Sequence, residues 1–286
     1  MANPTENTGP AAESWRRKTG LVKWRGLALI LVARNLKIRY KGSALGFFWS
    51  LLTPALTILM YAVFAHILKF NSGRPEYLQF LVTGLIAWGF TAGTLNDSLF
   101  SIAGNANLVK KVKFPRAILP LSTALANGVN FCLTLVPLVL YLAVTGSLRP
   151  AGFAWLVPAA LFQFLLCAGI ALLVGTLNVF FRDVQHAVGI GQLAWFFLTP
   201  VFYDLPMQLG AAPMHGAWKG LVFLNPMTGV LALWRRGLMG MPFVPEEWAG
   251  TVSPWWVALS CASCAAVFAV GAAALRSGDG KFGDVL

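Results

Sequence analysis

The sequence predicts an all-α membrane protein with six transmembrane helices, an N-terminal amphipathic helix at the membrane interface and re-entrant helices before the last span. Composition is the first reason, because 57% of the residues are hydrophobic and only 11% are charged. Several apolar runs are near the length of about 20 residues that crosses a hydrocarbon core of about 30 Å. Most of the 22 Lys and Arg residues flank these runs, as cations do at membrane surfaces.

The chain divides into two predicted regions. Residues 1–20 are predicted to be a disordered cytoplasmic leader, because they are rich in Pro and polar residues and lack the apolar core of a signal peptide. Residues 21–286 are predicted to form a single transmembrane domain. No second, soluble domain is expected.

Residues 21–41 have a helical pattern with one basic side, and their apolar run is too short to span a bilayer. The cations that share a sector of about 60° on this helix are Lys23, Arg34, Lys37 and Lys41. This pattern predicts an amphipathic helix along the cytoplasmic interface, with a plain basic anchor beside the membrane as the alternative. Either interpretation keeps the N-terminus in the cytoplasm.

The predicted spans begin after a basic cluster. The run 45–68 contains no charged residue and follows Arg39 and Lys41, so the chain enters the membrane from the cytoplasmic side. With six crossings, both termini are predicted to be cytoplasmic. The six spans are predicted at about residues 45–68, 77–102, 117–144, 153–181, 187–202 and 255–275.

The stretch 217–240 is apolar but interrupted. Asn225 and Pro226 break it into pieces of about eight residues, each too short to cross the membrane. We therefore predict a re-entrant helical hairpin over 217–240, with a seventh transmembrane span as the alternative. Between the fourth and fifth spans, Arg182 and Asp183 are predicted to form a tight structural turn on the cytoplasmic side.

Several kinds of chemistry are missing from the sequence. No GxxxxGK[ST] motif occurs, so the chain has no phosphate-cradling loop of its own. No carboxylate pair lies at membrane depth, and Asp97 and Asp183 are isolated acids near span ends, which argues against a metal-dependent membrane transferase and an ion-coupled carrier. Cys261 and Cys264 lack further ligands nearby, so we predict no metal site and no cofactor bound by this chain. The formal charge of +12 suits lipid headgroups rather than nucleic acid.

Four segments carry a family resemblance. In chain order they are RYKGSALGFFWSLLTP at 39–54, NLVKKVKFPR at 107–116, GTLNVFFRD at 175–183 and LNPM at 224–227. Together they resemble the permease subunit of type-2 ABC exporters of polysaccharides and polyol phosphates, of the O-antigen or teichoic-acid type. The resemblance extends over about residues 34–230 and is far more specific than any one segment. The family usually has an aromatic residue where Lys113 stands and an acid where Ala117 stands.

The resemblance implies a permease subunit, not an enzyme, in the bacterial inner membrane. A homodimer of the permease would pair with two copies of a cytoplasmic ABC ATPase, and ATP and Mg²⁺ would be bound by that partner. The implied substrate is an O-antigen-like polysaccharide linked to undecaprenyl diphosphate, or a teichoic-acid-like polymer. The alternatives are another lipid-linked or amphipathic substrate, a secondary carrier, and a membrane glycosyltransferase or phosphotransferase.

The resemblance also assigns a role to the basic loop before the third predicted span. Because this loop is short and contains Pro115, we expect it to move as a stiff lever that transmits closure of the ATPase. A topogenic cluster that only fixes orientation is the alternative. The residues expected to couple to the ATPase are Asn107, Lys110, Lys111, Phe114, Pro115 and Arg116.

A lipid-linked substrate would enter at the cytoplasmic headgroup level. Arg39 and Lys41 are expected to attract its diphosphate there, with Gly189 and Gly191 of the fifth span on the other side of the opening. Binding of ordinary lipid headgroups by the two cations is the alternative.

The later part of the substrate path is expected to be neutral. Trp195, Phe196 and Phe197 fall in the middle of the fifth predicted span, away from the membrane interfaces where Trp residues usually lie. They and Trp49 are expected to line a channel with faces on which sugars stack, with ordinary helix packing as the alternative. The Asn225–Pro226 break is expected to form the periplasmic gate.

Overall fold

The computed structural model describes residues 10–43, 45–67, 76–112, 114–203, 222–243 and 255–285. All regular elements in these ranges are helical, which confirms the predicted all-α class. The α-helices are α1 Pro10–Tyr40, α2 Trp49–Ile67, α3 Tyr77–Leu99, α4 Ala106–Lys111, α5 Ile118–Val144, α6 Leu156–Phe180, α7 Val184–Leu198, α10 Pro226–Met239, α11 Trp255–Gly278 and α12 Phe282–Val285. Short 3₁₀ turns are η1 Gly46–Phe48, η2 Ala103–Asn105, η3 Pro150–Trp155, η4 Val222–Leu224 and η6 Asp279–Lys281.

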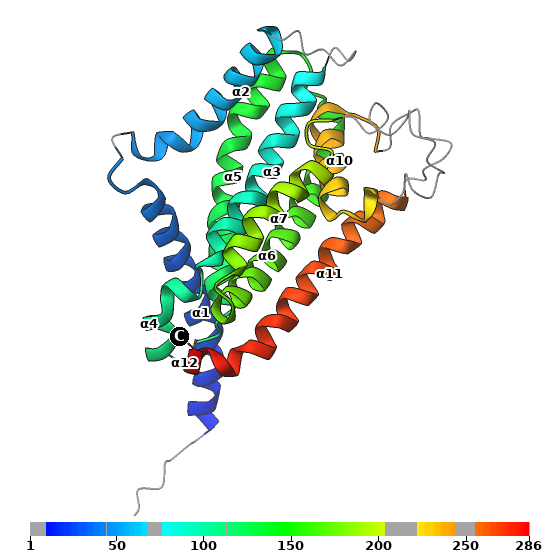
Figure 1. The fold of residues 1–286 in the computed structure, drawn as a ribbon. Helices are drawn as coiled ribbons and strands as arrows, with labels where there is room; N and C mark the ends of the chain where they lie inside the picture. The colour runs from blue at the N-terminus through cyan, green and yellow to red at the C-terminus, as the bar shows by residue number, and fades with distance from the viewer. Residues whose placement is uncertain are drawn as a thin grey trace, which may run out of the picture.

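Helices α3, α5 and α6 form the centre of an elongated bundle (Figure 1). Helix α11 packs along α6, α2 packs against α5, and α10 fills the space between α11, α6 and α3. Helices α4 and α12 lie with the first turns of α1 at one end of the bundle, and α10 lies near the other end. The predicted cytoplasmic segments therefore share one end.

Within the described residues, four helical stretches are long and apolar enough to cross a membrane: Tyr77–Leu99, Ile118–Val144, Pro150–Phe180 and Trp255–Gly278. They correspond to four of the six predicted spans. A shorter apolar stretch, Trp49–Val63, lies in the first predicted span. The six-span count therefore stays a prediction.

The fifth predicted span, 187–202, is a helix of only 15 residues, α7, which ends at Leu198. Its end has a local cause, because Thr199 is extended and precedes Pro200, whose ring disfavours helical backbone in the residue before it. At 1.5 Å per residue, α7 reaches about 22 Å, less than the thickness of a hydrocarbon core. Helix α7 begins three residues before the predicted span begins and ends four residues before it ends.

Helix α1 corrects the predicted disordered leader of residues 1–20. The helix begins at Pro10, and only residues 1–9 of that leader lie outside the described residues. Pro10 stands at the first helical position, where the missing N–H is not needed, and two alanines follow it. The amphipathic segment 21–41 is thus the second part of a longer helix.

Glycines bring the transmembrane helices close together. A Cβ added to Gly271 of α11 would lie 2.2 Å from the main-chain oxygen of Gly169 in α6. A Cβ added to Gly175 of α6 would lie 2.7 Å from Oγ of Ser101. Small residues at such crossings allow backbone contact between membrane helices.

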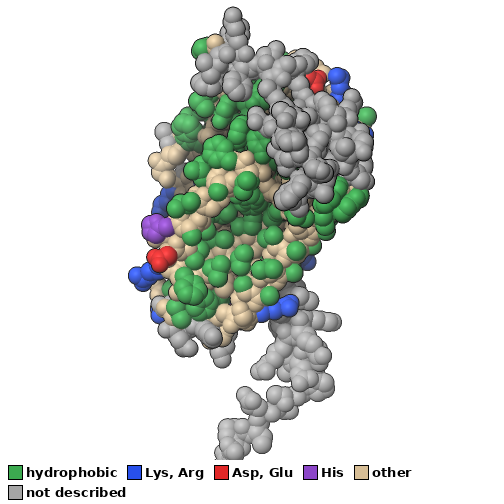
Figure 2. Space-filling view, turned by 45° about the vertical axis from the view of Figure 1, so that its right-hand side comes forward, with side chains coloured by type: hydrophobic (Ala, Val, Ile, Leu, Met, Phe, Trp, Pro, Cys, Tyr) green, Lys and Arg blue, Asp and Glu red, His purple; other side chains and the backbone are tan. Residues whose placement is uncertain are grey.

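The surface agrees with a membrane setting. Figure 2 shows hydrophobic side chains across the middle of one face, with charged side chains towards its edges. Helix α7 contributes Ile190, Leu193 and Leu198, which are 75%, 60% and 69% exposed. Exposed apolar surface of this extent is expected where a protein meets lipid or another protein.

Candidate functional site

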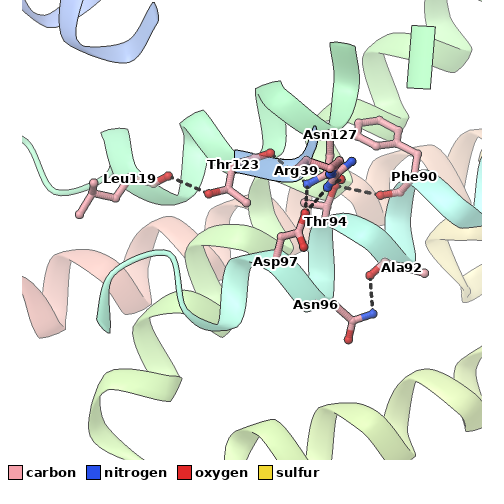
Figure 3. A network of polar contacts seen from close by, with 9 residues as sticks. All are labelled: Arg39, Phe90, Ala92, Thr94, Asn96, Asp97, Leu119, Thr123 and Asn127. Carbon is pink, nitrogen blue, oxygen red and sulfur yellow. Dashed lines mark hydrogen bonds and ion pairs between the residues drawn. The ribbon is translucent and has the colours of Figure 1, made fainter. Parts of the chain in front are cut away.

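The end of helix α1 is tied to α3 and α5 by a polar network (Figure 3). Nη2 of Arg39 pairs with Oδ2 of Asp97 near the end of α3 and donates to Oδ1 of Asn127 on α5 at 2.9 Å. Nδ2 of Asn127 donates to the same Asp97 oxygen at 2.9 Å. The three side chains therefore form a closed ring of charge-assisted hydrogen bonds.

The position of Asn127 depends on its neighbours. It is 4% exposed, and its Nδ2 also donates to the main-chain oxygen of Thr123, one turn earlier on α5, at 3.2 Å. Gly93 of α3 faces it, and a Cβ there would lie 3.1 Å from Oδ1 of Asn127. The missing side chain at Gly93 lets α3 and α5 approach closely enough to close the ring.

Two cavities meet at Arg39. One, of about 430 Å³, lies between α1, the end of α3 and α5, and its wall includes Asn35, Asn96, Asn105, Ser101 and Thr123. Both cavities are lined by Arg39 and Asn127, whereas Asp97 lines this first one.

The second cavity, of about 400 Å³, lies between α2, α3 and α5. Its polar lining is neutral apart from Arg39 and comes from Thr53, Thr57, Asn127, Asn130 and Thr134. Phe90 and Phe131, stacked with their ring centroids 5.0 Å apart, supply an aromatic wall. Such a lining can form hydrogen bonds to hydroxyl groups and contact C–H faces without a strong charge.

The other residues expected at the opening lie elsewhere in the chain. Lys41 is exposed in the turn after α1, and it does not line either of these two cavities. Gly189 and Gly191 lie on the exposed side of α7, and a Cβ on either would meet no atom within 4 Å. Of the four residues expected at the opening, only Arg39 lines these two cavities, and the substrate opening itself stays a prediction.

Three of the four predicted channel aromatics lie on α7 and the fourth, Trp49, begins α2, so their role as a channel stays a prediction. Trp195 and Phe196 pack on Trp88 of α3, with centroid distances of 5.3 and 5.4 Å. Phe197 is 56% exposed on α7 and Trp49 is 41% exposed at the start of α2. Neither Trp195 nor Phe196 lines the two Arg39 cavities.

Asn225 and Pro226 begin helix α10. Oδ1 of Asn225 accepts from the main-chain N–H of Met227 at 3.0 Å, and Pro226 occupies the first helical position. This is a standard N-terminal cap. The first arm of the predicted hairpin lies mostly outside the described residues, so re-entry of 217–240 stays a prediction.

The coupling segment is a short helix followed by a proline. Helix α4 exposes Asn107, Lys110 and Lys111 and buries Val109. Phe114 is half-buried against Trp24 of α1, with ring centroids 6.4 Å apart.

The C-terminal segment packs against this region, a contact that the sequence analysis missed. Arg116 pairs with Asp279 at 3.4 Å and lies 5.4 Å from the ring centroid of Phe282. Phe282 is fully buried and also contacts Phe180 at the end of α6. The available signal was the one aromatic residue in the C-terminal tail 276–286.

Arg182 and Asp183 form the turn between α6 and α7, and both are exposed. The main-chain oxygen of Asp183 accepts from the N–H groups of His186 and Ala187 at 3.0 and 3.1 Å. No group of His, Cys, Asp and Glu side chains suited to a metal ion occurs among the residues that the structure describes.

Four apolar helices of spanning length are typical of an integral membrane protein, and two cavities that share Arg39 lie between its helices. The chain belongs to the ABC-2 type transporter family, whose profile matches residues 27–238. It is therefore a membrane component of a transporter and not an enzyme.

Several curated proteins are similar over most of their length. The O-antigen export system permease protein RfbA of Klebsiella pneumoniae is 33% identical over 211 residues, covering 73% of this chain and 78% of that protein. RfbA of Myxococcus xanthus is 34% identical over 213 residues, with 74% and 79% coverage. The polysialic acid transport protein KpsM of Escherichia coli is 24% identical over 220 residues, with 73% and 80% coverage.

Proposed function

We propose that this chain is the transmembrane subunit of an ATP-driven exporter that moves a polysaccharide linked to undecaprenyl diphosphate across the bacterial inner membrane. Membership of the ABC-2 family and the names of the similar export permeases support this proposal. An O-antigen-like polymer is favoured over a teichoic-acid-like one, because two of these relatives are named for O-antigen export.

The observation that carries the proposal is the position of Arg39 between two different cavities. A guanidinium at the end of the basic helix α1 attracts a diphosphate, and a mostly neutral, hydroxyl-rich and aromatic groove continues from it. A lipid-linked glycan needs this order, because its diphosphate arrives at the headgroups while its sugars must slide without being trapped. Coulomb attraction of about 1–4 kcal/mol per cation is enough to bias binding and still permit release.

The assembly that we propose is a homodimer of this permease with two copies of a cytoplasmic ABC ATPase that binds ATP and Mg²⁺. Both termini are cytoplasmic, and the exposed side of α4 with Phe114, Pro115 and Arg116 docks on the ATPase. The exposed apolar side of α7, with Gly189 and Gly191, supports a role for this helix at the subunit interface or the lipid opening. Asn225 and Pro226 mark the periplasmic gate.

The test is removal of the gene, followed by complementation. We expect loss of surface polymer, accumulation of lipid-linked polymer inside the cell, and rescue by the unmodified chain. The variant Arg39→Glu with Lys41→Glu should not rescue, although it still assembles with the ATPase. Glu76→Gln, a change of charge directly before α3, is a control that should rescue fully. Normal surface polymer without the gene contradicts the proposed function.

A further inference from the structure

The guanidinium of Arg39 is held by an acid that water can reach. The side chains of Arg39 and Asp97 are 32% and 44% exposed, and both line the cavity between α1, α3 and α5. Ion pairs that are this accessible contribute little to stability, typically about 0–1 kcal/mol. Asp97 therefore competes with any anion that enters the cavity.

We propose that Asp97 occupies Arg39 as an internal substitute for a diphosphate and releases it when the diphosphate of a lipid-linked substrate enters this cavity. The proposal rests on the proposed function and deepens it, because it names the contact that the substrate displaces. A diphosphate carries more charge and more acceptor oxygens than one carboxylate, so it competes effectively for the same guanidinium. When no diphosphate is bound, Asp97 occupies the guanidinium of Arg39, so anions of lower charge cannot displace it.

Asn127 limits the cost of this exchange. Its Nδ2 donates to Oδ2 of Asp97 at 2.9 Å, so the carboxylate keeps a donor when Arg39 turns away. Its burial and its bond to the oxygen of Thr123 hold this donor in place. Breaking an ion pair usually costs free energy because a polar group is left without a hydrogen bond, and the bond from Asn127 to Asp97 reduces that cost.

The cavity also supplies neutral donors for phosphate oxygens. Asn96 and Asn105 line it, and each donates to a main-chain oxygen, at 2.9 and 2.8 Å. An amide nitrogen carries a second N–H that can turn to a ligand. Thr123 lines the same wall, but its hydroxyl group already donates to the main-chain oxygen of Leu119 at 3.2 Å, so the two amides are the donors that remain. These groups can hold a diphosphate without adding the net charge that would prevent its release.

The competing explanation is that Arg39 and Asp97 only fasten α1 to α3. The two explanations predict opposite effects of removing the carboxylate. An internal competitor weakens ligand binding, so Asp97→Asn should bind a diphosphate more tightly. A fastener supports the site, so the same variant should bind more weakly and melt at a lower temperature.

The experiment uses the full chain in phosphatidylcholine nanodiscs, with farnesyl diphosphate as the probe. For Asp97→Asn we expect the affinity to rise by up to about fivefold, the size expected for releasing one exposed ion pair. Arg39→Gln should lose binding, and the double variant with Asp97→Asn should not regain it. Glu76→Gln makes the same change of charge beside the opposite end of α3 and should bind like the unmodified chain.

Equal or weaker binding by Asp97→Asn overturns the proposal, and so does binding retained in the double variant. Competition by phosphatidylglycerol as strong as that by the probe also overturns it, because the site would then select headgroups in general. Competition by inorganic pyrophosphate supports recognition of the diphosphate itself. These binding results are independent of surface polymer in cells, so failure of this inference and failure of the proposed function are distinguishable.

Discussion

Trp195 donates its indole N–H to Oδ1 of Asn225 at 2.9 Å, which joins the end of α7 to the start of α10. The same Oδ1 caps α10 through Met227, while Nδ2 of Asn225 donates to Oγ1 of Thr199 at 2.8 Å. One amide therefore contacts both the end of α7 and the start of α10 and holds a predicted channel aromatic. If α7 and α10 move relative to each other, these hydrogen bonds of Asn225 must break or move with them.

We predict that Asn225→Ala lowers the melting temperature of the purified permease by several degrees. The variant loses the helix cap, which is worth about 1 kcal/mol, and leaves the N–H of Trp195 without this acceptor. Asn225→Ser keeps a capping oxygen and should recover part of the loss, whereas Trp195→Phe removes only the indole donor. Melting of Asn225→Ala at the unmodified temperature would show that the contact is not stabilising.

The α6–α11 crossing should not tolerate a side chain at Gly271. A Cβ there meets the main-chain oxygen of Gly169, which cannot move without shifting a helix, so Gly271→Ala should destabilise the protein by about 1–3 kcal/mol. Gly189→Ala is the matched control, since its Cβ meets open space and the substitution should be neutral or slightly stabilising. Thermal unfolding in detergent compares them. Equal stability of the two variants contradicts close packing at this crossing.

The contact between Arg116 and the C-terminal segment predicts a role for Phe282 in coupling. Phe282→Ala removes a buried ring beside Arg116, so the segment after α4 should lose its support. In the assembled complex we expect ATP hydrolysis to persist and export to fall at least severalfold, as for Phe114→Ala with Arg116→Ala. Val285→Ala, an exposed position on α12, is the control. Normal export by Phe282→Ala at matched expression would remove the C-terminal segment from the coupling path.

The topology can be tested without any substrate. Six spans with a re-entrant 217–240 put Arg276 and the C-terminus in the cytoplasm, whereas a seventh crossing puts them outside. A reporter fused after Leu286 that is active only in the cytoplasm should therefore be active. Activity of a periplasmic reporter at the same point would support seven spans instead.

The sequence by itself determined the helical membrane class, the family and several local features. Composition and apolar runs act over one helix at a time, and the Asn225–Pro226 pair acts within one turn, so each can be recognised without knowing what packs against it. The end of α7 before Pro200 was equally local, yet the length of the apolar run concealed it. The helix from Pro10 was missed because a polar, Pro-containing composition outweighed its helix-forming residues.

Only the tertiary structure decided which polar groups meet. Arg39 contacts Asp97, 58 residues away, and Asn127, 88 residues away, and no local pattern in the sequence pairs these three residues. Phe282 and Arg116 are likewise far apart in the sequence and in contact in the structure. Hydropathy shows that a segment prefers lipid, but it does not determine the rotation of a helix about its axis or its neighbour. Close contacts at glycines such as Gly93 and Gly271 fix both, and thereby decide where the charges and cavities lie.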